Sequence, residues 1–458
     1  MSKTKSQAVL ALEALEPGYR DKFGVPKETK LNQYSLGWFK LFEELKLEKQ
    51  LERDGYFRVT PTEIKNVTSL EPRLMSKHDF GEQRPWIFKD RGLSMLPLAR
   101  GEYIVGQFDL YQSFPSIESS HINRLTMPSD IESFDFSDLT SEAVALNAAF
   151  IAGAFDNFLE DGTLRHTLSG RMSTAQFNIR LNLPQGVPEF SVEKAQMEID
   201  AGYEGNSSLA IVEAKNKLSS DFNVRQLYFP FLRFRDVLRS KTVRNIYQVY
   251  SGGIVNLFEY EFSNPLDFTS IELTKSARYM LSNEQITLAD LVELANRARS
   301  RVTGVNLDVP FPQADSFERV VNTCETLAEE GSLTKQELEL NNGFTYRQAD
   351  YYMNAGRYLG LIDLPDDDGA YPLSEQGKYI MKQDNIRDRN LAFAEAILLD
   401  SVFNQTFLDY AKIGRMPDKS RIEQNIQAAG LNISGTTVGR RASTVAAWVR
   451  WITALVVE

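Results

Sequence analysis

The chain has little of what many functional sites are built from, with one cysteine, Cys324, and three histidines, His78, His121 and His166, among its 458 residues. A single cysteine excludes a disulfide framework and a cysteine-based zinc site. Three scattered histidines do not make a histidine metal cage, so oxygen atoms would have to hold a catalytic metal. Oxygen ligands suit a hard cation such as Mg²⁺.

Several sequence signals are also missing. The sequence contains no run of about 18 apolar residues, which a membrane-spanning helix would need. The apolar patch near the N-terminus is interrupted by Glu13 and Glu16, which does not fit a signal peptide. No GxxxxGK[ST] phosphate loop occurs, so ATP is not an expected ligand. The sequence therefore predicts a cytoplasmic protein with no membrane partner.

Charge is unevenly distributed along the chain. The net charge of −11, from 62 acidic and 51 basic residues, argues mildly against a nucleic-acid partner. Residues 125–164 hold eight acids and no Lys, Arg or His, whereas residues 218–252 hold six bases and two acids, and residues 411–458 hold seven bases and three acids. Such basic stretches are compatible with DNA binding, although each can also be an ordinary solvated face.

The middle of the chain alternates between strand and helix patterns. A helix is predicted over 141–159, and a basic helix over 221–240 that Pro230 must break or bend. Strands are predicted over 195–203, 209–214, 243–250 and 254–262. The mixed order favours an α/β (α+β) core at 126–280, preceded by a helical and strand-containing region at 1–125.

The region 285–385 has the pattern of a winged helix-turn-helix. It combines a helix over 334–340, a turn, a longer helix over 345–361 and a wing over 363–373. A plain helical hairpin is the alternative. On the longer helix Ala349, Met353 and Leu359 are expected to point inward. The candidates for outward-facing DNA contacts are Tyr346, Arg347 and Asn354.

The last segment, 386–458, is predicted to be helical. Arg440 and Arg441 fall early in its final helix, where a recognition helix usually presents its DNA contacts. A second helix-turn-helix and a dimerisation or packing helix are equally compatible with this pattern.

The sharpest chemical signal is Asp200 on one predicted strand, followed by Glu213 and Lys215 on the next. Residues two apart on a strand share a face, so Glu213 and Lys215 point together. If the strands pair, Asp200 approaches Glu213. Two neighbouring carboxylates repel unless a cation lies between them, which suits Mg²⁺. The alternative is a surface hairpin with a solvated Glu–Lys pair.

This arrangement resembles the PD-(D/E)XK nuclease pattern, here Asp200…Glu213-x-Lys215. The stretch 209–216 and the helix that begins near 224 are similar to the core of bacterial type II restriction endonucleases. Looser likeness is found at 169–173, at 71–75 and in the C-terminal region. The resemblance implies a restriction-endonuclease-like core with an appended winged-helix DNA-binding region.

The resemblance also implies roles for individual residues. Asp200, Glu213 and the main-chain carbonyl of Ala214 would hold the metal, while Lys215 would orient the attacking water. Glu142 and Gln226 are further catalytic candidates, with Glu198 as an alternative metal ligand. The DNA-contact candidates in this region are Arg171 and Arg225.

The expected function is that of a Mg²⁺-dependent type II restriction endonuclease that hydrolyses phosphodiester bonds in double-stranded DNA. Cutting both strands favours a homodimer. A separate methyltransferase is expected, because no methyltransferase glycine motif occurs in the chain. The alternatives are a winged-helix transcription regulator with an inert nuclease-like domain, a structure-specific repair nuclease and a helical scaffold protein.

Overall fold

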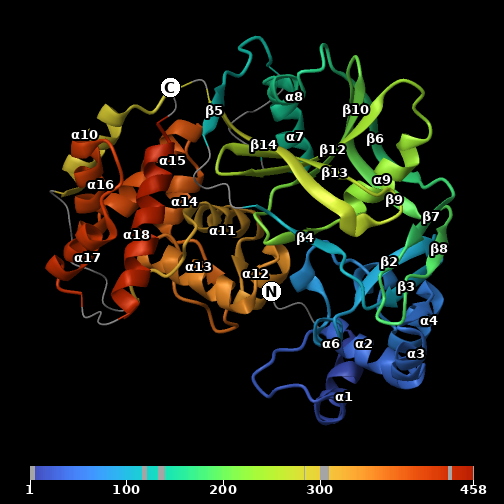
Figure 1. Ribbon diagram of the computed structural model, residues 1–458. Coiled ribbons are helices and arrows are strands. Elements are labelled where there is room, and N and C mark those ends of the chain that lie inside the picture. The colour runs from blue at the N-terminus through green and yellow to red at the C-terminus, as the bar shows by residue number, and fades with distance from the viewer. Residues whose placement is uncertain are drawn as a thin grey trace.

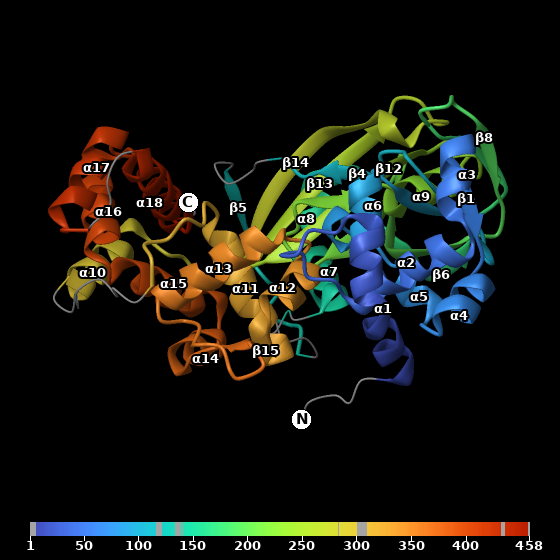
Figure 2. The ribbon, with the colours of Figure 1, turned by 90° about the horizontal axis from the view of Figure 1, so that it is seen from below.

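A computed structural model describes residues 6–115, 121–132, 139, 141–282, 284–299, 309–431 and 436–456. Three parts follow one another along the chain (Figure 1). An N-terminal part packs beside a central seven-stranded sheet, and a C-terminal helical part packs where β5 and β14 form one edge of that sheet, as both views show (Figure 2).

The N-terminal part surrounds a small antiparallel sheet with the strand order β1-β3-β2. Trp38 and Phe39 are fully buried in its core, and Gly55 ends α3 in the left-handed conformation (φ 76°). The elements are α1 (Gln7–Phe23), α2 (Gln33–Glu44), α3 (Leu47–Asp54), β1 (Tyr56–Val59), α4 (Pro61–Thr68), α5 (Pro72–Met75), α6 (Trp86–Arg91), β2 (Ser94–Ala99) and β3 (Glu102–Gly106).

The central sheet has the order β5-β14-β13-β12-β10-β9-β6 and is mixed. β10 runs parallel to β12, and helix α9 (Arg225–Arg235) makes the connection between them, while β9 and β10 form an antiparallel hairpin. The α/β class is thereby confirmed. The strands are β5 (Ile122–Leu125), β6 (Arg165–Ser173), β9 (Gln196–Glu204), β10 (Ser208–Lys215), β12 (Thr242–Ser251), β13 (Ile254–Phe262) and β14 (Ile271–Leu281), and a separate ribbon pairs β7 (Phe177–Arg180) with β8 (Glu189–Val192).

Helices cover both faces of the sheet. Leu209 and Ile211 of β10 lie in one apolar cluster with α9, whereas Ala210 and Val212 lie in another with α7 (Glu142–Ile151) and α8 (Ala154–Leu159). A strand that is buried on both faces is apolar along its whole length, which is why 209–212 has no polar residue.

Two helix predictions are wrong in detail. The helix expected over 141–159 is two helices, because Gly153 adopts a left-handed φ of 79° between them. The basic helix begins only at Arg225, because Asp221–Asn223 forms strand β11 against β4 (Tyr111–Ser113). That helix also runs through Pro230 without ending there. Its apolar side is buried on the sheet, and such packing contributes more to helix stability than propensity does.

The C-terminal part is helical and has one large apolar core around Trp448 and Phe403. Its first helices form a compact unit in which β15 (Ser332–Leu333) pairs antiparallel with β16 (Tyr371–Pro372), and Ile362 bridges to Leu373. The helices are α10 (Leu288–Arg299), α11 (Phe317–Glu330), α12 (Lys335–Asn342), α13 (Tyr346–Tyr358), α14 (Glu375–Met381), α15 (Ile386–Leu398), α16 (Ser401–Ile413), α17 (Lys419–Ala428) and α18 (Thr436–Ala454).

The predicted pair of helices is confirmed, although the turn expected at 341–343 begins only at Gly343, because α12 runs to Asn342. Capping boxes start both α12 and α13, with Thr334 and Thr345 as the N-cap residues. The inward positions Ala349, Met353 and Leu359 are buried, although α13 ends at Tyr358 rather than at 361.

Within the described ranges no single helix is long and apolar enough to cross a membrane. The pair α15 and α16 would pass on length and composition together, but the two helices are bent by 112°.

Asp161 fixes the turn of the β9–β10 hairpin. Its two carboxylate oxygens accept hydrogen bonds from the backbone and hydroxyl groups of Ser207 and Ser208, at 2.6–2.9 Å. A Cβ atom on Gly205 would lie 2.4 Å from Asp161 Oδ2, so this turn has no room for a side chain there. Burial raises the pKa of Asp161, but these four hydrogen bonds outweigh it and bring the pKa to about 2.

We expect Asp161→Asn to lower the free energy of unfolding by about 2 kcal/mol, because an amide turns a donor toward groups that are themselves donors. The folded-state pKa is below the unfolded one, so the difference from wild type is fully present above about pH 4 and disappears as the pH falls to about 2. Urea unfolding at several pH values measures it. Asp156→Asn, an exposed position on α8, is the control and should change stability by less than about 0.5 kcal/mol.

Candidate functional site

The candidate residues lie where the pairing between strands β9 and β10 ends. The described pairing runs from Leu209↔Glu204 to Val212↔Ala201 and stops there. One residue further, Asp200 Oδ2 accepts a hydrogen bond of 2.7 Å from the Ala214 N–H. The carboxylate thus replaces a strand carbonyl as the partner of this amide, and it lies directly beside Glu213.

Glu213 and Lys215 project from the same side of β10, as the strand period predicts. Lys215 Nζ donates to Glu213 Oε1 at 2.6 Å and to the Ala214 carbonyl at 3.0 Å. Gln226, in the first turn of α9, donates from Nε2 to the same Glu213 oxygen. Glu213 is only 6% exposed, so these contacts take place away from bulk solvent.

Glu142 joins the group from the start of α7, with Oε2 3.8 Å from Lys215 Nζ. Asp200, Glu213, Lys215, Glu142 and Gln226 are therefore brought together from two strands and two helices. Three carboxyl groups thus lie around one ammonium group.

Burial is the largest cause of the pKa shifts in the cluster, and the neighbouring charges modify them. Burial raises the pKa of Glu213 to about 8; the charge of Lys215 opposes this rise and the charge of Asp200 adds to it. Burial also raises the pKa of Asp200 and of Glu142. Burial lowers the pKa of Lys215, but the charges of Glu213, Glu142 and Asp200 outweigh it and hold that pKa above its ordinary value. Lys215 is therefore protonated at neutral pH.

The cluster fits a hard divalent cation. Asp200 and Glu213 supply carboxylate oxygens, and Ala214 supplies a carbonyl oxygen, which are the ligand types of Mg²⁺. Among the described residues no three His, Cys, Asp or Glu side chains already have the spacing of a metal site, so the fit depends on two carboxylates and one main-chain oxygen. Buried Gln226 Oε1 and Tyr247 Oη have no hydrogen-bond partner in the described structure, and such atoms usually mark a place for water or ions.

Asp79 belongs to this neighbourhood and was missed by sequence reasoning. Its charge contributes to the raised pKa values of Asp200, Glu213 and Glu142. It is placed by a backbone hydrogen bond of 3.0 Å from the Asn223 N–H to the Asp79 carbonyl. Nothing in the sequence connects a loop residue of the N-terminal part with a hairpin more than 100 residues later.

A pocket of about 460 Å³ lies between the N-terminal part and the central sheet, and it is lined by Asp79 and by Arg225, the residue before Gln226. Arg73, Lys77 and Arg100 line it from the N-terminal side, and Arg225 lines it from the start of α9. Asp79 and Glu198 are also in its wall. The pocket therefore brings basic side chains close to the carboxylate cluster.

The other candidates of the central part lie on the surface. Arg171 of β6 pairs with Glu198 of β9 at 3.3 Å, and both side chains are about half exposed. Glu198 thus has a cationic partner outside the carboxylate cluster. Arg225 is half-buried, with its guanidinium 5.8 Å from the Phe229 ring.

In the C-terminal part the structure supports only some of the predicted surface contacts. Tyr346 and Arg347 are exposed in the first turn of α13, and Asn354 is half-buried. Arg440 is exposed. Arg441, in contrast, is buried and donates to the Pro312 carbonyl at 3.1 Å. Arg441 thus lacks the exposure that a DNA contact requires, because α18 turns this residue toward the core.

Comparison with known proteins gives three successive family matches. Each is described as a domain of unknown function: DUF6996 at residues 35–105, DUF6997 at 106–280 and DUF7226 at 319–457. The carboxylate cluster draws Asp200, Glu213, Lys215, Glu142 and Gln226 from the second of these. Neither the curated proteins nor the solved structures contain a match to the chain.

We expect calorimetric titration with Mg²⁺ to show binding that weakens by at least about tenfold in Asp200→Asn, since one ligand charge is lost. The asparagine oxygen can still accept from the Ala214 amide, so the hairpin should stay intact. Glu272→Gln, an exposed position on β14, serves as the matched control. Equal affinity in Asp200→Asn and wild type would contradict a metal-binding role for Asp200.

Proposed function

We propose that the chain is a Mg²⁺-dependent, sequence-specific endonuclease of double-stranded DNA, of the restriction type. The observation that carries the proposal is the convergence of Asp200, Glu213 and Lys215 at the point where a hairpin opens, with Gln226 from the next helix on Glu213. The resemblance to the PD-(D/E)XK pattern rests on three of these residues, and their closeness in space supports it.

Asp200, Glu213 and the Ala214 carbonyl would hold the Mg²⁺ ion, which, when bound, supplies positive charge for the scissile phosphate and makes a bound water more acidic. Lys215, protonated and fixed by two hydrogen bonds, orients the water for in-line attack and stabilises the developing charge. Gln226 holds the Glu213 carboxylate in place.

The pocket beside the cluster supports a path for the DNA backbone. Arg73, Arg100 and Arg225 are basic groups in its wall. Phosphate contacts of this kind supply affinity and register without reading sequence. The chain as a whole is acidic, so the basic groups matter through their position and not through net charge.

For sequence reading we propose the unit 317–373. Its order of helix, short strand, two helices and a hairpin supports a winged helix-turn-helix, with α13 as the recognition helix. Tyr346 and Arg347 lie at the start of α13, where base contacts are usually made. A homodimer is the simplest way to cut both strands, and protection of host DNA would need a separate methyltransferase.

The central test is DNA cleavage. We expect purified protein to cut unmethylated or methylated plasmid and phage DNA into discrete fragments with Mg²⁺ and not with EDTA. Asp200→Asn and Lys215→Ala should each lower the rate by about 1,000-fold or more, since each removes several kcal/mol of transition-state stabilisation. Gel electrophoresis of time courses measures the rates.

Glu272→Gln is the matched carboxylate control and should keep wild-type activity. Intact DNA under every condition, together with retained gel-shift binding, would overturn the nuclease proposal and favour a DNA-binding regulator. Cutting that follows DNA structure instead of sequence would favour a repair nuclease.

The role of α13 has a separate test. Arg347→Ala should weaken binding of a cleavable duplex by about 5–30-fold, corresponding to the loss of about 1–2 kcal/mol for a base or phosphate contact. The rate at saturating DNA should stay within about twofold of wild type. Fluorescence anisotropy in Ca²⁺ measures the affinity. Lys412→Ala, exposed on α16, is the control, and an unchanged affinity in Arg347→Ala would argue against α13 as the recognition helix.

A further inference from the structure

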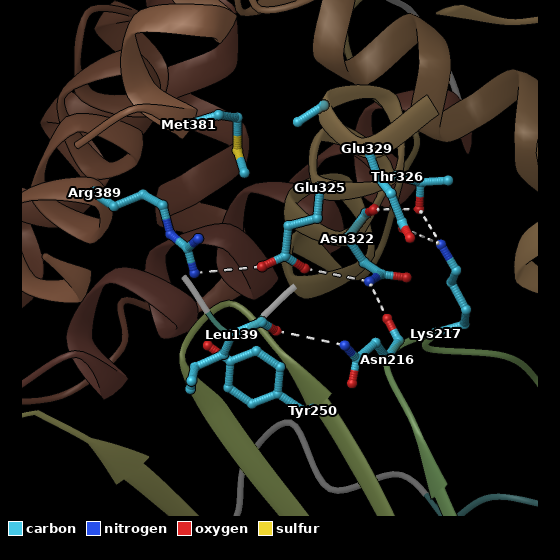
Figure 3. Close-up of a pocket in the computed structure, with 11 residues that line it drawn as sticks. Leu139, Asn216, Lys217, Tyr250, Asn322, Glu325, Thr326, Glu329, Met381 and Arg389 are labelled. Carbon is cyan, nitrogen blue, oxygen red and sulfur yellow. Dashed lines mark hydrogen bonds and ion pairs between the residues drawn. The ribbon is translucent and has the colours of Figure 1, made fainter. Parts of the chain in front are cut away.

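The segment that follows Lys215 is held by the C-terminal part. Asn322, on α11, donates from Nδ2 to the Asn216 carbonyl at 2.9 Å and accepts at Oδ1 from the Leu218 N–H at 3.1 Å. Figure 3 shows the Asn322 amide pointing to this backbone, beside Lys217. The Asn322 side chain therefore holds the backbone at Asn216 and Leu218, one and three residues after Lys215.

Asn322 is itself held from α12. Asn342, the last residue of that helix, donates from Nδ2 to Asn322 Oδ1 at 2.9 Å and to Thr326 Oγ1 at 3.2 Å. Asn322 is 1% exposed and Asn342 is not exposed at all. A hydrogen-bonded path thus runs from the end of α12, before α13, to the backbone next to Lys215.

A second contact runs parallel to the first. Arg319, three residues before Asn322 on α11, donates to the Ser219 carbonyl at 3.3 Å and to the Tyr352 hydroxyl at 3.4 Å. Tyr352 belongs to α13. The same face of α11 therefore contacts both the segment 216–219 and the helix proposed to read DNA.

A buried polar side chain such as Asn322, at the contact between α11 and the segment 216–219, requires an explanation. Val320, Val321, Cys324 and Leu327 of α11 are buried and apolar, whereas Asn322 and Thr326, one helical turn apart, are buried and polar. Burying an amide is unfavourable unless it is fully hydrogen-bonded, so simple packing would favour an apolar residue at Asn322. A satisfied buried network instead holds one defined arrangement.

The space around Asn322 leaves room for the contact between α11 and the segment 216–219 to rearrange. A pocket of about 360 Å³ adjoins the contact, and Lys217, Asn322, Glu325 and Arg389 are in its wall (Figure 3). Within it Arg389 pairs with Glu325 at 3.3 Å, and Glu325 also accepts from Ser251 and Gly252 of the sheet. The space lies between the two parts and not inside either of them.

We propose that Asn322 is a positioning residue that couples the C-terminal part to Lys215. Contact of α13 with DNA shifts Asn342 and Arg319, and Asn322 passes the shift to the backbone at 216–218, which sets the position of the Lys215 ammonium. This inference rests on the proposed nuclease function. It implies that the enzyme cuts fast only when the reading unit is engaged.

The test compares binding with catalysis in the full-length protein. Asn322→Ala should leave the affinity for a cleavable duplex within about twofold and lower the single-turnover rate at saturating DNA by about 10–100-fold, the usual cost of a small misplacement. Asn342→Ala, which does not touch the catalytic strand, should also lower the rate. Because both residues act through one path, the single-turnover rate of the double variant should be no lower than that of Asn322→Ala alone.

Glu329→Ala is the matched control, since it removes the ion pair with Lys217 at the same interface but leaves Asn322 in place. Its rate should equal that of wild type. An Asn322→Ala rate equal to wild type would overturn the proposal, as would losses that multiply in the double variant. If Asn322→Ala does not fold, Asn322→Asp, which keeps the acceptor and loses the donor to Asn216, takes its place.

Hydrogen–deuterium exchange separates this inference from the proposed function. Asn342→Ala should speed exchange of the amides of 216–219 several-fold relative to Glu329→Ala, whether or not the protein cuts DNA. A wild type that does not cut would sink the nuclease proposal alone. Unchanged exchange in Asn342→Ala would overturn the coupling.

Discussion

The candidate site depends on one hydrogen bond, from the Ala214 N–H to the Asp200 carboxylate. It forms where the β9–β10 pairing stops, and it uses a side chain where a sheet would use a carbonyl. The hairpin turn at the other end is fixed by Asp161, so the register of the two strands is held from both ends. A shift of one residue would turn Glu213 to the opposite face of the sheet.

Electrostatics explain why such a cluster is stable only when positive charge compensates its carboxyl groups. Asp200, Glu213 and Glu142 surround one ammonium group, and burial raises the pKa of all three carboxyl groups. This arrangement lowers the stability of the folded state, because apolar residues would be more favourable at buried positions of a sheet. Like charges held together at the open end of a hairpin are typical of sites that bind a cation or transfer a proton.

The parts that could be predicted from the sequence are those with local causes. Leu209–Val212 reads as a strand buried on both faces, and Thr345 with Gln348 marks a helix start, because neighbouring residues decide these features. The grouping of Asp200, Glu213 and Lys215 also follows from strand period and hairpin length. The sequence predicts that Pro230 breaks or bends the helix; the helix does not break there, because packing of α9 on the sheet outweighs the lost backbone hydrogen bond.

The remaining features arise from contacts between distant segments. The backbone of Asp79 is held by Asn223 and Gln83, and Arg441 is buried where it donates to the Pro312 carbonyl. Neither long-range contact leaves a pattern in the residues around it. Asn322 is similar, since nothing in the sequence of α11 indicates that its partner is the backbone at 216–218. The N-terminal loop thus contacts β11, and α11 contacts the segment directly after β10, so both ends of the connection between β10 and α9 are held by distant parts of the chain.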